Sequence, residues 1–143
     1  MAVSVHKNQT QSTRAWTLTA NPHEIQRWRQ AVAEALRRWG ASREAIDLAC
    51  LGVSELLSNV IKHVDDPRCR LRVRRVGERI VVQLIDRSPT PPSFEAPDWD
   101  SESGRGLWML REMCAQFGWE KVPSQLGAKC VWFSCALTNK VER

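Results

Sequence analysis

One stretch of the chain, residues 42–64, constrains the fold more than any other. Apolar residues recur there at helical spacing and share one face: Ile46, Ala49, Val53, Leu57, Val60 and Val64. In its first half, further apolar residues lie on or beside the opposite face: Leu48, Leu51, Gly52 and Leu56. A helix that is apolar nearly all round is buried. The rest of the chain must therefore supply a layer that covers it.

Strand-type segments before and after this helix supply that layer. Two of them form a hairpin through Gly77-Glu78, and shorter helical patterns start at Pro22 and Leu107 and end near Trp39 and Gln116. The order β-α-α-β-β-loop-α-β-β predicts an α+β two-layer sandwich, with a mixed but mainly antiparallel sheet and about three helices on one face. We expect a flexible tail over residues 1–13 and a single domain over residues 14–138. The predicted strands are 14–20, 69–76, 79–86, 119–122 and 129–137.

Composition and charge narrow the classes of function. No apolar run approaches the ~18 residues that a membrane span needs, and the polar N-terminus lacks the apolar core of a secretory signal. We therefore expect a cytoplasmic protein that does not enter a membrane. The five cysteines are scattered and include no Cys-x-x-Cys pair, which argues against a zinc site or a disulfide framework.

The net charge of +5 comes with a run of arginines that could attract nucleic acid. Three of them alternate with apolar residues, which is the pattern of a strand with one solvated face. We favour that interpretation over nucleic-acid binding, because no nucleic-acid motif accompanies the run. The alternating residues are Cys69, Arg70, Leu71, Arg72, Val73 and Arg74.

Two polar residues on the long helix are candidates for chemistry. Glu55 and Asn59 are four residues apart and therefore adjacent on the helix surface. They could simply face solvent. In apolar surroundings, however, a carboxylate and an amide need partners, and a metal-bound ligand would supply them.

Two further candidates follow in the sequence. Asp86 ends the apolar strand 80–85, on the strand face that we expect to meet the helices. A carboxylate there could accept a hydrogen bond from an exocyclic amine, or it could only begin a proline-rich turn. Gly104-Arg105-Gly106-Leu107 opens a helix, and helix-opening amides attract anions such as phosphate. The alternative for this segment is an ordinary turn.

Together, in this order, these pieces resemble the GHKL ATPase pattern, also called the Bergerat fold. Residues 55–63, which read ELLSNVIKH, are most similar to the anti-sigma-factor serine/threonine kinases within that superfamily. Residues 127–133, which read GAKCVWF, resemble their closing strand. The resemblance extends from about residue 14 to residue 137.

The resemblance implies a protein serine/threonine kinase that binds ATP and Mg²⁺. Its partner would be a sigma factor or an anti-anti-sigma-type protein within a partner-switching system, and a homodimer is a further assembly to test. Asn59 would hold Mg²⁺, Glu55 would be the general base, and Asp86 would bind the adenine amino group. The phosphate-binding end of the site would be formed by Gly104, Arg105, Gly106 and Leu107.

Two positions depart from the family pattern. Arg87-Ser88-Pro89 follows Asp86 where the superfamily often has glycines, and Cys130 stands where a threonine is frequent. A second function therefore stays open, that of a non-catalytic nucleotide-binding module that sequesters a regulatory protein. The segment 87–103 contains four prolines and no periodicity, and we expect it to act as a lid over the phosphates.

Overall fold

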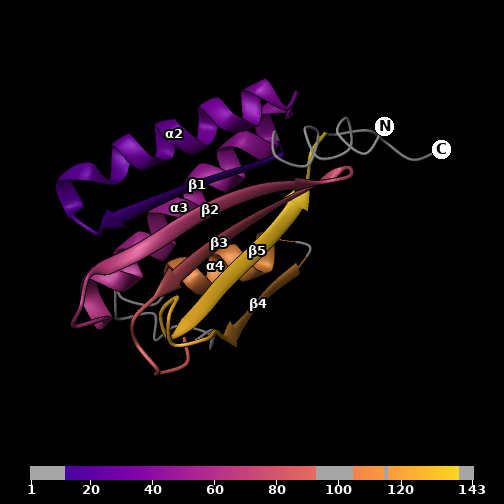
Figure 1. Ribbon diagram of the computed structural model, residues 1–143. Coiled ribbons are helices and arrows are strands. Elements are labelled where there is room, and N and C mark those ends of the chain that lie inside the picture. The colour runs from indigo at the N-terminus through magenta and orange to yellow at the C-terminus, as the bar shows by residue number, and fades with distance from the viewer. Residues whose placement is uncertain (1–11, 93–104, 115, 139–143) are drawn as a thin grey trace, which may run out of the picture.

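The computed structural model of the chain describes residues 12–92, 105–114 and 116–138 (Figure 1). Five strands form one sheet in the order β1-β2-β3-β5-β4, and every neighbouring pair is antiparallel. The strands are β1 (Thr13–Thr19), β2 (Arg68–Val76), β3 (Arg79–Asp86), β4 (Gln116–Lys121) and β5 (Lys129–Ala136). The helices are the 3₁₀ turn η1 (Pro22–Glu24), α2 (Ile25–Arg38), α3 (Arg43–His63) and α4 (Arg105–Met113).

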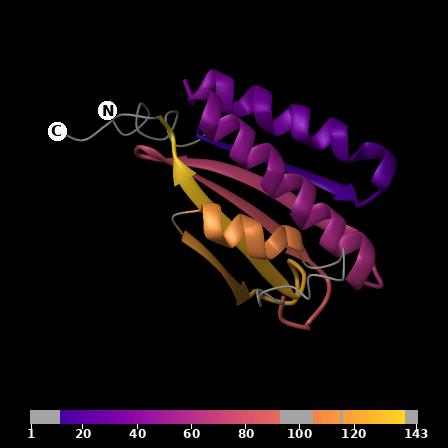
Figure 2. The same cartoon turned by 180° about the vertical axis from the view of Figure 1, so that it is seen from behind.

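The molecule has two layers. The helices α2, α3 and α4 cover one face of the sheet (Figure 2), and the opposite face is open (Figure 1). This confirms the predicted α+β sandwich with three helices on one face, and within the described strands the sheet is antiparallel rather than mixed. No helix in the described ranges is long and apolar enough to cross a bilayer.

The central helix α3 begins and packs as its sequence predicts. Ser42 caps it, because its Oγ accepts a hydrogen bond from the Ala45 N–H at 3.1 Å. Gly52 lies where α3 crosses β5, and a Cβ at this position would overlap the Phe133 ring. The missing side chain therefore lets α3 lie close against the middle of the sheet, with the core between the two layers.

The strand β2 explains the arginine run. Its burial alternates residue by residue along the strand: Cys69, Leu71 and Val73 are buried, whereas the arginines between them are exposed or only partly buried. The prediction of a strand with one wet face is thus confirmed. The arginines lie on the open face of the sheet.

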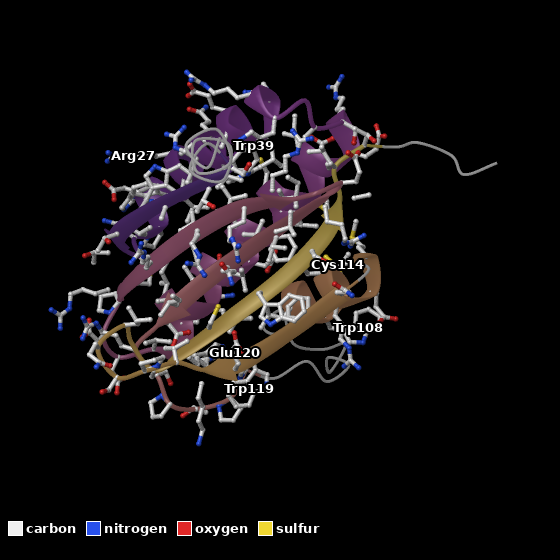
Figure 3. All side chains as sticks on the ribbon, turned by 45° about the vertical axis from the view of Figure 1, so that its right-hand side comes forward. Arg27, Trp39, Trp108, Cys114, Trp119 and Glu120 are labelled. Atoms are coloured by element: carbon white, nitrogen blue, oxygen red, sulfur yellow. The ribbon has the colours of Figure 1, made fainter. Side chains whose placement is uncertain are left out.

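The boundary between α4 and β4 differs from the prediction. The helix ends at Met113 and the strand begins at Gln116, three residues earlier than expected. Phe117 stacks on Phe133 with ring centroids 6.4 Å apart, and this packing draws the segment into the sheet. Trp119 also packs against the core, whereas Glu120, next along β4, is exposed (Figure 3).

Candidate functional site

The polar side of α3 meets the first turn of α4. Glu55 projects from α3 toward Gly106, and a Cβ at Gly106 would overlap the Glu55 carboxylate. A side chain at this position would therefore displace the carboxylate. Two residues predicted to share a site, 51 positions apart in the sequence, are thus in contact.

The environment of Glu55 favours its protonated form more than water does. The side chain is half-buried, and desolvation raises the pKa of its carboxyl, an effect that the charge of Lys62 partly offsets. A carboxyl whose pKa is raised is better matched to proton transfer near neutral pH.

One turn further along α3, Asn59 borders a cavity of about 350 Å³. Leu107 of α4, His63 of α3 and Lys129 of β5 also line it. The volume is within the range of small-molecule sites. Asn59 and Leu107, both predicted site residues, therefore share one cavity with a buried cation. Three larger surface hollows in the described part of the chain, of about 610, 540 and 480 Å³, contain none of the predicted site residues.

Asp86 lies at the end of β3, buried, with 2% of its surface exposed. Its Oδ1 accepts hydrogen bonds from the Lys129 ammonium and from the Ser88 N–H, each at 2.9 Å. Lys129, equally buried, also donates to the Ser88 carbonyl oxygen at 3.1 Å. The cavity wall at this point is Lys129 and Ser88 rather than Asp86 itself.

Sequence reasoning missed Lys129. The residue begins an apolar strand and looks like a charged strand end, but β3 and β5 are neighbours and their register places it opposite Asp86. The two opposite charges compensate each other. Burying either charge without its partner would be strongly destabilising. The signal in the sequence was that Lys129, like Asp86, is a charged residue at the end of a predicted core strand. This signal can be interpreted only when the strand order is known.

The other predicted residues divide between the described and undescribed parts of the chain. Arg105 and Gly106 form the first turn of α4, and Gly106 is the residue that contacts Glu55. Gly104 and most of the predicted lid, residues 93–103, lie outside the described residues. The side chain of Arg105 is also outside them.

The residues at the cavity are suited to a metal ion that is bound mainly by the phosphates of a nucleotide. In the described ranges, no three His, Cys, Asp or Glu side chains gather into a metal site. Mg²⁺ is commonly bound by one or two protein oxygens together with substrate phosphates. The oxygen of Asn59, beside the cavity and one turn from Glu55, could supply such a ligand.

The fold is thus a helix-covered antiparallel sheet in which α3 contacts the first turn of α4 through Glu55 and borders a cavity through Asn59, an arrangement that agrees with the resemblance found in the sequence. The family pattern described as the histidine kinase-like ATPase domain matches residues 18–134. The chain belongs to this family, which implies that it binds nucleotide.

A solved structure is also similar to this chain. It is the crystal structure of the RsbU and RsbW domains of Rv1364c from Mycobacterium tuberculosis, with a TM-score of 0.63 and 16% sequence identity. The alignment covers 92% of this chain and 35% of that one, so this chain spans about a third of the other's length. A likeness at this identity supports the fold. Among curated proteins, no significant match is found.

Proposed function

We propose that this protein is an ATP-dependent protein serine/threonine kinase of the anti-sigma-factor type. It would transfer the γ-phosphoryl group of ATP to a hydroxyl of an anti-anti-sigma-type partner and thereby control the availability of a sigma factor. The observation that carries the proposal is the contact between Glu55 and Gly106, one helical turn from Asn59 at the cavity. The residues that we propose as base and as metal ligand therefore lie next to the helix end that we propose binds the phosphates.

Each residue has a defined task in this reaction. The hydroxyl oxygen of the partner attacks the γ-phosphorus while Glu55 takes the hydroxyl proton. The bond between the γ-phosphorus and the bridging oxygen breaks, and ADP leaves with that oxygen. The amides of the α4 first turn, beginning at Arg105 and Gly106, face the phosphates and favour their negative charge. Phosphoryl transfer demands mainly positioning and charge neutralisation, so this small set is chemically sufficient.

Mg²⁺, held by Asn59 and the phosphate oxygens, would neutralise charge on the transferring group. At the other end of the site, Asp86 would accept a hydrogen bond from the adenine amino group. Leu107, which lines the cavity and is 5% exposed, would contact the nucleotide with its apolar side chain.

The test separates binding from transfer. Mg-ATP should raise the melting temperature of the wild-type chain, because a ligand that binds only the folded state stabilises it, and EDTA should reduce the shift. Glu55→Gln should keep the shift and lose transfer of labelled phosphate to a partner captured from cell lysate. Glu34→Gln, an exposed substitution on α2, is the matched control.

Three results would change the conclusion. No melting shift at millimolar Mg-ATP would remove the central claim. Transfer by Glu55→Gln at the wild-type rate would show that another group is the base. Nucleotide binding by the wild type without transfer to its captured partner would favour the sequestering module instead.

A further inference from the structure

The buried pair between Asp86 and Lys129 has hydrogen-bonding capacity to spare. An ammonium has three donors, and two of them reach Asp86 Oδ1 and the Ser88 carbonyl oxygen. Both hydrogen bonds that Asp86 accepts from described residues go to Oδ1, so that Oδ2 remains available. Among the described residues, the third donor of Lys129 and Oδ2 of Asp86 therefore have no hydrogen-bond partner.

Lys129 is part of the cavity wall. Lys129 lines the cavity that Asn59 and Leu107 also line, although its side chain is only 3% exposed. Its ion pair fixes the ammonium in place, since Asp86 and Ser88 hold it from the β3 side. A fixed, desolvated ammonium makes stronger hydrogen bonds than one in water.

We propose that Lys129 reads the nucleotide base together with Asp86, by donating a hydrogen bond to the ring nitrogen beside the exocyclic amine of adenine. This inference rests on the proposed function and assigns a specificity-determining residue to the same site. Adenine has an amine donor with a ring-nitrogen acceptor on either side of it, N1 and N7. Lys129 in the cavity wall offers a donor of this kind, and Asp86, which binds it from behind the wall, offers the acceptor.

Lys129 also positions Asp86 for this task. The ion pair holds the carboxyl at the end of β3, and both hydrogen bonds that it accepts from described residues go to Oδ1, which leaves Oδ2 for the amine. A purely structural lysine would stabilise the fold without sensing the ligand's ring nitrogens. The two roles are therefore separable with ligand analogues.

The experiment measures dissociation constants by titration calorimetry for ATP, 1-deaza-ATP and 7-deaza-ATP, each with Mg²⁺. On the wild-type chain, the analogue that lacks the contacted nitrogen should bind about tenfold or more weakly than ATP, the usual effect of losing a charge-assisted hydrogen bond. Lys129→Met should weaken ATP binding by a similar factor and reduce the analogue effect to about twofold or less. Circular dichroism checks that the variant is folded.

The outcomes are distinct. If both analogues bind the wild type as tightly as ATP, Lys129 does not read the base, and this conclusion needs no variant to fold. If Lys129→Met keeps the full sensitivity to the deaza analogues, another group or a water makes the contact and the inference is wrong. If the wild type binds ATP but the inference fails, the proposed function still stands; if it binds no ATP at all, both fall.

Discussion

Gly106→Ala tests the contact that brings α3 and α4 together. A Cβ at this position would overlap Oε2 and Cδ of Glu55 and lie 2.9 Å from its Cγ. These atoms are the flexible end of a side chain and not backbone, so the chain can relieve the overlap by rotating the carboxylate away. The substitution should therefore act on the position of Glu55 more than on the fold.

The magnitude follows from two opposing terms. Forcing Glu55 from its rotamer costs about 0.5–1.5 kcal/mol, whereas replacing a helical glycine by alanine contributes up to about 1 kcal/mol. The two nearly cancel, so the free energy of unfolding should change by less than about 1 kcal/mol. In a Glu55→Ala background the overlap is gone, and the same substitution should stabilise by up to about 1 kcal/mol.

The assay is urea unfolding of the wild type, both single variants and the double variant. The coupling between the two positions should be about 1 kcal/mol, and phosphoryl transfer by Gly106→Ala should fall at least tenfold, because a displaced catalytic group loses most of its effect. Equal effects of Gly106→Ala in both backgrounds, within about 0.3 kcal/mol, would show that Glu55 does not lie over this residue and would refute the geometry.

Two further predictions concern buried charge. Lys129→Met should lower the free energy of unfolding by about 3–5 kcal/mol in urea titrations, because it leaves the Asp86 carboxylate buried without its partner; adding Asp86→Asn should recover part of the loss, and no recovery would contradict the ion-pair account. Burial raises the pKa of Glu55 above its ordinary value of 4.5, so its contribution to stability is fully present below that pH and is lost as pH rises through the folded-state pKa. Glu55→Gln should accordingly be more stable than the wild type at neutral pH, with the difference vanishing below about pH 4.5 in unfolding curves; a pH-independent difference would contradict this.

The helices and most strands of the fold could be predicted because their signals are local and periodic. Every turn of α3 repeats the same apolar stripe, and β2 alternates buried and solvated residues along its whole length. The Glu55–Asn59 pair follows from helical spacing alone. Such features need no knowledge of which elements become neighbours.

The start of β4 and the role of Lys129 could not be predicted, because both depend on tertiary neighbours. The helical pattern in the sequence continues to about Gln116, and the packing of Phe117 on Phe133 overrides its last part. Lys129 is an ordinary charged residue until β5 inserts between β3 and β4 and places it opposite Asp86. Both features depend on which strands are neighbours, and the periodicity of a single sequence does not determine the strand order.

The same strand order sets the direction of the proposed site. Glu55, Asn59 and His63 follow one another at four-residue intervals along α3, a rise of about 6 Å each. Glu55 contacts the first turn of α4, whereas Asn59 and His63 border the cavity with Lys129. A nucleotide bound as proposed would therefore lie along α3, with its phosphates toward Gly106 and its base toward the end of β3. In this arrangement β5 would contact the adenine ring, and α3 and α4 would contact the reacting phosphate. Substitutions at Lys129 should therefore change nucleotide affinity, whereas substitutions at Glu55 should change phosphoryl transfer.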